Sequence, residues 1–280
     1  MWKQKIGISV GNNWLRPVGE VMQMMRRIGF DAVSPEWEKD VDMDGVIKAA
    51  RDAGLELQSL HAPFSKMNLL WQQEMGEHDF PLDGLFASLE VCKKHSIPVL
   101  VVHCWIGFEY EDQPNEIGLK NYGKLVERAA EYGVSIAFEN TEGGEFTEAL
   151  LEHFKGHENV GFCWDSGHEM CYNHSEDLLG KFGDRLLVTH LNDNLGISRF
   201  SGETYWHDDL HLLPYDGIAD WDDNIKRLKA SKPLEILNFE LNRFSKPNRF
   251  DNDIYQKLSL EEYYTEAYKR ACRIAYRYAK

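Results

Sequence analysis

The chain has 280 residues, of which 43% are hydrophobic and 28% charged, a composition typical of an ordinary folded globular protein. Its 31 Lys and Arg against 46 Asp and Glu give a net charge of −15, which disfavours general binding to nucleic acids or anionic membranes. Five cysteines without C-x-x-C spacing exclude a disulfide framework and favour a reducing compartment. The chain shows no signal-peptide pattern and no run of 18 apolar residues, so we expect a cytoplasmic protein without a membrane anchor.

Short apolar segments alternate with longer segments of helical periodicity along the whole chain. The segments that we expect as strands are residues 4–10, 30–36, 55–61, 97–103, 134–140, 159–165, 185–191 and 234–240. Short apolar runs of this kind are typical of strands buried on both faces of a parallel sheet. Apolar residues at three- and four-residue spacing predict helices between the strands and over 261–278. Gly29, Gly54 and Gly133 follow helical patterns just before strands, where a left-handed cap would end each helix.

The segments after the predicted strands differ from those before them. Long polar and aromatic segments follow strands at residues 62–81, 104–114, 192–220 and 241–257, whereas the turns that precede strands are short. Elaborated loops at the carboxyl ends of strands are typical of the working face of a barrel. No linker or repeat divides the chain. We therefore predict an α/β fold with a single (β/α)8 barrel domain over residues 1–280, and a doubly wound open sheet is the alternative.

The predicted strands end in side chains that can bind a metal ion, namely His61, His103, Glu139, Asp165, His190 and Glu240. In a parallel barrel these ends meet at one mouth, and His168, Asp209 and His211 follow in the adjoining loops. Carboxylates crowded in a buried mouth repel one another unless a cation neutralises them. Mixed imidazole and carboxylate ligands suit Zn²⁺, Mn²⁺, Co²⁺ or Fe²⁺ better than Mg²⁺ or Ca²⁺. The sequence therefore predicts a divalent metal site at the C-terminal mouth of the barrel.

The order and spacing of the motifs resemble the xylose-isomerase-like barrel superfamily. The segments that carry the resemblance are HAPF (61–64), VVHCW (101–105), IAFENTEGG (136–144), WDSGH (164–168), THLND (189–193), DLHLLPYDGIADW (209–221) and NFEL (238–241). The resemblance spans nearly the whole chain and supports the barrel fold. That superfamily includes sugar-phosphate isomerases and epimerases, ketose 3-epimerases, inosose dehydratases and endonuclease-IV-type apurinic endonucleases.

The resemblance implies two alternative ligand sets. The epimerase-like pattern implies one catalytic metal held by Glu139, Asp165, His190 and Glu240, with His168 touching the substrate. The endonuclease-like pattern implies a cluster of up to three zinc ions. It uses the same four residues together with His61, His103, His168, Asp209 and His211. The chain matches both sets, so between one and three ions of Zn, Mn or Co are expected.

Three functions follow from these observations. The first is metal-dependent isomerisation or epimerisation of a small sugar or sugar phosphate through an enediolate, with Glu139 and Glu240 as acid and base on opposite sides of the mouth. The second is zinc-dependent phosphodiester hydrolysis. The acidic loops after the second and third strands oppose it, because an acidic face repels the phosphates of a nucleic acid. The third is a non-catalytic sugar-binding barrel.

Several other side chains are candidates for substrate binding. Of six tryptophans at or after predicted strand ends, we expect Trp14, Trp37 and Trp105 to stack on substrate. Lys66 could cover the mouth, and Arg243 begins a basic run with Lys246 and Arg249 at a place where barrels often bind phosphate.

Two further features concern packing. We expect Cys104 and Cys163 to pack between the barrel and the helices. The Tyr and Ala stripe of the last helix would either close the barrel or form a homo-oligomer contact.

Overall fold

The computed structural model describes residues 4–12 and 16–280. Within these ranges the strands form two parallel sheets, with the orders β3-β2-β1-β9 and β4-β5-β6-β7-β8. The strand bounds are β1 (Lys5–Val10), β2 (Ala32–Pro35), β3 (Glu56–Leu57), β4 (Leu60–His61), β5 (Val99–His103), β6 (Ser135–Glu139), β7 (Val160–Asp165), β8 (Leu186–His190) and β9 (Ile236–Phe239). The predicted third strand is therefore interrupted, and its two pieces, β3 and β4, belong to different sheets.

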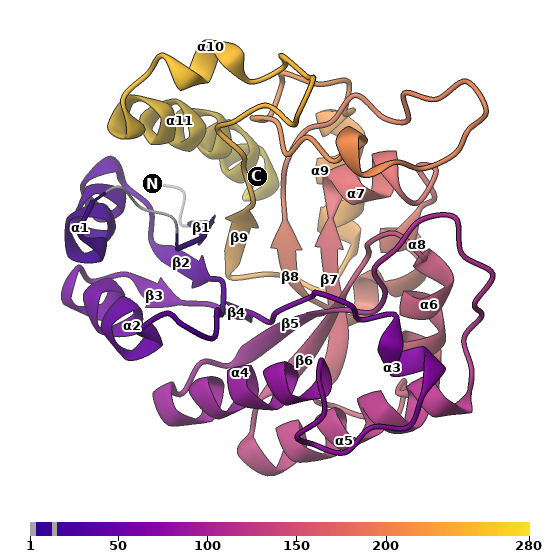
Figure 1. Cartoon of the computed structure of the whole chain (residues 1–280). Helices are drawn as coiled ribbons and strands as arrows, with labels where there is room; N and C mark the ends of the chain where they lie inside the picture. Colours follow the sequence, from indigo (N-terminus) through magenta and orange to yellow (C-terminus); the bar gives the residue numbers. More distant parts are fainter. Residues whose placement is uncertain (1–3, 13–15) are drawn as a thin grey trace.

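The two sheets meet at both of their edges and close a barrel. A parallel bridge joins Glu36 to His61 at one junction, and another joins Leu191 to Phe239 at the other. Figure 1 shows the strands curled around a common centre with helices outside them. The (β/α)8 barrel prediction is confirmed, and the open doubly wound sheet is not observed among the described residues.

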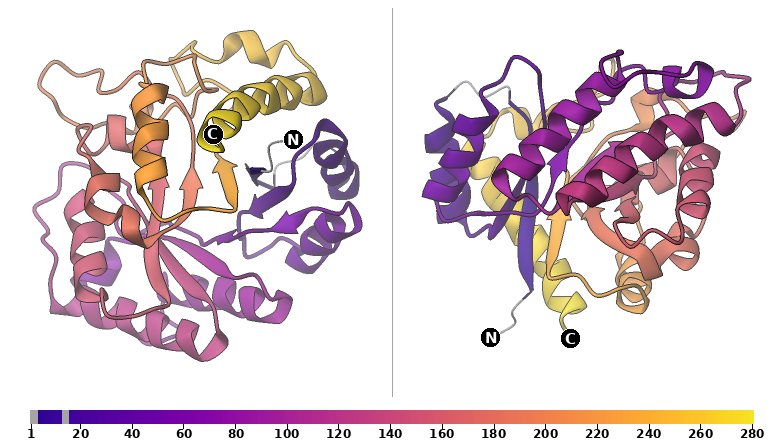
Figure 2. Two further views of the ribbon diagram at one scale, coloured as in Figure 1. Left: turned by 180° about the vertical axis from the view of Figure 1, so that it is seen from behind. Right: turned by 90° about the horizontal axis from the view of Figure 1, so that it is seen from below.

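Helices cover the outside of the strands on all sides (Figures 1 and 2). Their bounds are α1 (Val18–Ile28), α2 (Met43–Asp52), α3 (Leu69–Gln72), α4 (Leu82–His95), α5 (Glu116–Tyr132), α6 (Gly144–His153), α7 (Ser166–Cys171), α8 (Leu178–Phe182), α9 (Trp221–Ala230), α10 (Asp253–Gln256) and α11 (Leu260–Tyr278), with 3-10 turns η1 (Gly183–Arg185) and η2 (Trp206–Asp208). Gly29, Gly54 and Gly133 have φ values of 127°, 75° and 67°, which confirms the predicted left-handed positions before strands.

The last helix, α11, completes the helical layer. It packs against both α1 and α9, and its Tyr263, Ala267 and Ala271 are buried within the chain. The buried part of the Tyr and Ala stripe therefore packs within the chain, the first of the two predicted alternatives, whereas Tyr276 is exposed. No helix in the described part of the chain has the length and apolar character needed to cross a membrane.

A separate apolar cluster fills the barrel interior below the mouth on the β5–β8 side. Its members are Val99, Val101, Ala137, Cys163 and Val188. Cys104 belongs to the larger core between strands and helices, as predicted. The prediction for Cys163 is wrong, because this residue lies two positions before Asp165 and alternation along a strand places both on the inner face.

Candidate metal centre and substrate cavity

The nine predicted ligand residues converge at the carboxyl ends of the strands and form three overlapping groups. The inner group, whose ligand atoms all lie within 4.8 Å of one another, consists of Glu139, Asp165, His190 and Glu240. The first outer group is His61 and His103, which share Glu139 with the inner group. The second outer group is His168, Asp209 and His211. Its histidines adjoin Asp165, and Asp209 Oδ1 lies 3.3 Å from His168 Nε2 and 2.6 Å from His211 Nε2.

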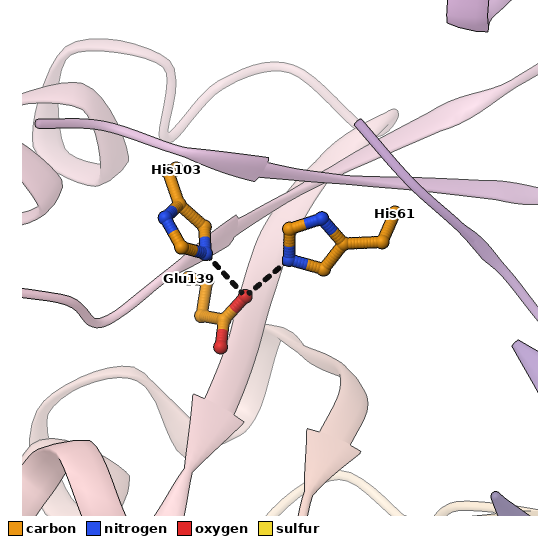
Figure 3. A group of neighbouring side chains, drawn as sticks. All are labelled: His61, His103 and Glu139. Atoms are coloured by element: carbon orange, nitrogen blue, oxygen red, sulfur yellow. Dashed lines mark hydrogen bonds and ion pairs between the residues drawn. The ribbon is translucent and has the colours of Figure 1, made fainter. Parts of the chain in front are cut away.

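Glu139 links the inner group to the first outer group. Its Oε2 lies 3.3 Å from both His61 Nε2 and His103 Nε2, and Figure 3 shows the two imidazoles pointing at this one oxygen. Its Oε1 lies 2.9 Å from His190 Nδ1. The side chain is completely buried. Each carboxylate oxygen of Glu139 thus faces a different set of imidazoles, the arrangement that a bridging ligand requires.

Backbone carbonyls orient three of the histidines. The Nδ1 atoms of His61, His168 and His211 lie 2.7, 3.0 and 3.3 Å from the carbonyl oxygens of Ala62, Asn140 and Glu240. Since a carbonyl only accepts, each Nδ1 donates, and each Nε2 faces a carboxylate of the site. Metal-binding histidines are typically oriented in this way.

The donor set fits a divalent cation. Asp209 Oδ1 is buried and makes no hydrogen bond, although two imidazole nitrogens approach it. Within the inner group, and within the first outer group together with Glu139, the ligand atoms of the imidazoles and carboxylates lie within 4.8 Å of one another. Mixed ligands of these two types favour Zn²⁺, Mn²⁺ or Co²⁺. The residues present are therefore suitable ligands for the predicted metal.

The start of α7 holds Asp165 in place. Asp165 Oδ1 accepts the backbone N–H of His168 at 2.7 Å and so caps the helix, and Asn192 Nδ2 donates to both carboxylate oxygens at 3.1 and 2.9 Å. A Cβ on Gly167 would lie 1.9 Å from Asn192 Oδ1, which explains the glycine in D-S-G-H. The motif thus positions both Asp165 and His168.

Burial and neighbouring charges shift the pKa values of the carboxyl groups in different directions. Burial raises the pKa of Asp165 above its usual value. Burial opposes ionisation of Glu139 too, but the imidazoles of His190 and His103 hold its pKa well below the usual range. Against the same effect of burial, His190 lowers the pKa of Glu240 to about 2. Glu139 and Glu240 are therefore anions at neutral pH, ready to bind a cation.

A cavity of about 480 Å³ opens above the ligand groups. His61, His103, His168, His211 and Glu240 border it from below, and other walls carry the aromatic side chains of Phe64, Phe108, Tyr172 and Trp206. Pockets of this size with apolar walls and a few polar groups are typical small-molecule sites. The cavity accommodates a ligand the size of a small sugar.

A family model described as Xylose isomerase-like TIM barrel matches residues 22–258. The chain belongs to this family. The uncharacterized protein y4fM of Sinorhizobium fredii is 27% identical over 261 residues, with 78% of this chain and 79% of that protein covered.

Two solved structures illustrate the family fold. The IolI protein, solved with a bound zinc atom, matches with a TM-score of 0.70 and 18% identity, covering 97% of this chain and 98% of that one. D-psicose 3-epimerase from Clostridium cellulolyticum H10 matches with a TM-score of 0.69 and 14% identity, with the same coverage. These matches confirm the resemblance predicted from the motifs.

Of the tryptophans predicted to bind substrate, the two that the structure describes, Trp37 and Trp105, do not line the cavity. Trp105 is 1% exposed and stacks on Phe146 at a centroid distance of 4.1 Å, so it packs between β5 and α6. Trp37 is half-buried against the main core and is absent from the lining given by the described residues. Trp14 lies outside the described residues. Trp206 lines the cavity instead.

Of the basic residues predicted near the substrate, one lines the cavity and the others do not. Arg243 Nε lies 3.2 Å from the Tyr255 carbonyl oxygen, and its Nη2 donates to the carbonyls of Gln256 and Leu258, so its guanidinium fixes a loop and does not face substrate. Lys66 is exposed and is not among the described residues that line the cavity. Lys246 does line the cavity, with Nζ 3.1 Å from Asp209 Oδ2.

Sequence reasoning missed two acidic residues of the cavity, Glu36 and Glu142. Glu36 follows β2 directly, so the strand-end argument that found the ligands could have found it. Glu142 follows β6 in the segment ENTEGG, and its position depends on the path of a loop.

Proposed function

We propose that the chain is a metal-dependent isomerase or epimerase of a small sugar. The observation that carries the proposal is the approach of Glu139 and Glu240 to the same atom, His190 Nδ1, at 2.9 and 3.0 Å beneath a sugar-sized cavity. Sugar epimerases share the fold, among them the D-psicose 3-epimerase described above. Isomerisation or epimerisation through an enediolate needs a general base beside the carbon whose proton is removed, and a carboxylate can fill this role.

The inner group would hold the divalent ion, which supplies a Lewis acid for the substrate carbonyl when bound. Glu240 borders the cavity, and 26% of its side chain is exposed. It can therefore accept a proton from a bound sugar. Glu139 lies beneath the imidazoles of His61 and His103 and is completely buried. In our proposal it is the second acid and base, which returns a proton from the opposite side when the product is an epimer.

Deuterium incorporation tests both roles. Protein loaded with Mn²⁺, Co²⁺ or Zn²⁺ is incubated in D₂O with a panel of ketoses and aldoses, and product and exchange are followed by NMR. We expect deuterium at the carbon next to the carbonyl, and strong loss of exchange in Glu240→Gln and Glu139→Gln. Glu145→Gln is the matched control, because Glu145 is exposed and accepts the Tyr110 hydroxyl away from the ligands. Full turnover in both variants would exclude the acid and base roles.

Phosphodiester hydrolysis is a second candidate because the five residues outside the inner group also converge. His61 and His103 share Glu139, and Asp209 adjoins both His168 and His211, so two further ions could be held. Metal content per chain, measured by plasma mass spectrometry, separates the candidates. About one ion, unchanged in Asp209→Ala, supports sugar chemistry. Two or three zinc ions that fall in this variant, together with nicking of abasic duplex DNA at low salt, would support hydrolysis.

The same preparations test a non-catalytic sugar-binding barrel. Sugar affinity measured by calorimetry should depend on the metal if the inner group handles substrate. Equal affinity of the metal-free and metal-loaded protein would favour binding without catalysis.

A further inference from the structure

Two carboxylates that belong to none of the three ligand groups line the substrate cavity. Glu142, which follows β6, is 5% exposed and accepts the backbone N–H of Gly107 at 3.1 Å. Glu36 follows β2, on the other sheet, and among the described residues no side chain donates a hydrogen bond to its carboxylate. Neither forms an ion pair with a described Lys or Arg. Burial raises the pKa of both carboxyl groups, and hydroxyl donors of a ligand would stabilise their ionised form.

The basic residues near the cavity are engaged elsewhere. Arg249 Nη1 lies 3.1 Å from Asp208 Oδ1, and its Nε lies 2.9 Å from Asp251 Oδ2. Arg243 donates to backbone carbonyls, as described above. Lys246 is the one Lys or Arg among the described lining residues, and Asp209 neutralises it. The described lining therefore offers no unpaired Lys or Arg to a phosphate group.

The remaining walls suit the carbon skeleton of a sugar. Phe64, Phe108 and Trp206 line the cavity, and Trp206 is 40% exposed. Aromatic faces at a binding site pack against C–H groups, while nearby polar groups bind hydroxyls. Carboxylates form strong charge-assisted hydrogen bonds with hydroxyl donors and repel other anions.

We infer that the substrate is an uncharged polyhydroxy compound, a free sugar and not a phosphate ester, whose hydroxyl groups donate to Glu142 and Glu36. This inference rests on the proposed function for its reaction and adds the substrate class. It makes Glu142 and Glu36 specificity-determining residues. The two carboxylates favour hydroxyl donors over phosphate from two sides of the cavity.

The test compares matched pairs, D-fructose with D-fructose 6-phosphate and D-ribulose with D-ribulose 5-phosphate. Turnover and calorimetric binding are measured on metal-loaded protein. We expect a preference for the free sugar of about tenfold or more, the size of one lost charge-assisted hydrogen bond or one unfavourable charge contact. Glu142→Gln and Glu36→Gln should each lower kcat/KM for the free sugar. Each should also reduce the ratio of kcat/KM for the free sugar to kcat/KM for the phosphate ester. Glu145→Gln makes the same charge change outside the main cavity and should leave the preference unchanged.

The outcomes separate the inference from the proposed function. Turnover that favours the phosphate ester, or a preference that neither Gln variant narrows, overturns the substrate class and leaves the isomerase proposal standing. If no sugar is turned over, the isomerase proposal fails, and the calorimetric affinities for the free sugar and its phosphate ester then test the substrate class. A higher affinity for the free sugar than for its ester, with a smaller affinity ratio in the two variants, would support the substrate class without the isomerase proposal. Equal binding of the pair, or no binding of either, overturns it.

Discussion

The two sheets of the barrel fill its interior with different side chains. On the β5–β8 side the layer below the mouth is apolar, with Val99, Val101, Ala137, Cys163 and Val188 in contact. On the other side small polar residues are joined by hydrogen bonds. Asn238 Nδ2 donates to Ser9 Oγ at 2.9 Å, and Ser59 Oγ donates to Ser34 Oγ at the same distance.

The apolar side of the interior supports the metal ligands, and the polar side leaves space for a substrate. His103, Glu139, Asp165 and His190 each lie two residues after a member of the apolar layer, so that layer supports the ligands directly. Ser9, Gly11 and Ser34 line the cavity, and their small side chains leave space for a ligand. One sheet thus holds most of the ligands, while the other provides room for substrate and contributes Glu240.

The largest effect is expected where the ligand-bearing sheet meets the site, at Glu139. Glu139→Gln keeps the shape but removes the charge that His61, His103 and His190 surround. We expect turnover to fall by about 100- to 10,000-fold, the usual contribution of a general acid or base, and bound metal to decrease. Kinetics and metal analysis check this result. If the variant retains bound metal and full turnover, the ligands from the other strands are enough for metal binding and catalysis, and Glu139 has neither role.

Trp105 and Trp206 test the division between packing and binding. Trp105→Ala removes a buried ring stacked on Phe146, and should lower the free energy of unfolding by about 3–5 kcal/mol with little change in KM. Trp206→Ala removes a half-exposed ring of the cavity, and should raise KM by about 3- to 10-fold with little loss of stability. Urea unfolding and kinetics on both variants measure the two effects. A raised KM in Trp105→Ala, together with a loss of stability in Trp206→Ala, would show that Trp105 contacts substrate and that Trp206 serves packing.

A smaller pair of substitutions compares the two interior layers directly. Val188→Ala removes buried methyl groups from the apolar layer, and should cost about 2 kcal/mol of stability while KM stays unchanged. Ser9→Val adds bulk to the cavity wall, and should lower kcat/KM more than it lowers stability. If Val188→Ala changes KM and Ser9→Val does not, the proposed separation of tasks is incorrect.

The strand-end ligands could be found from sequence because a parallel barrel brings the carboxyl ends of its strands together. Apolar runs located Glu139, Asp165 and His190, and the structure places their side chains within one ligand group. Cys163 was misplaced although the same period of two, applied consistently, puts it on the inner face with Asp165.

The cavity walls could not be predicted with the same success, because they depend on loops. Trp206 comes from the 3-10 turn η2, and Glu142 accepts a hydrogen bond from Gly107 in a different loop. No periodic pattern fixes such contacts between segments far apart in the chain. The position of Arg243 in the chain predicts a phosphate contact, but its guanidinium binds backbone carbonyls at the end of α10.

The smallest effect is expected outside both interior layers, at the start of α8. Asp177 accepts the backbone N–H of Gly180 at 2.9 Å and pairs with Arg227 at 3.1 Å, and its side chain is 62% exposed. These contacts, the helix cap first, hold the pKa of Asp177 below its usual value. Because exposure screens the ion pair, we expect Asp177→Ala to cost about 1 kcal/mol at pH 7, mainly through loss of the cap.

The pH dependence of this cost has a definite sign. A lowered carboxyl pKa stabilises the folded state fully above the unfolded value of about 3.9, and this stabilisation is lost as the pH falls through the folded value. The difference between wild type and Asp177→Ala should therefore be constant from pH 5 to 7 and shrink below about pH 4. Urea unfolding at several pH values measures it. A difference that persists unchanged at pH 3 would show that Asp177 acts through packing and not through its charge.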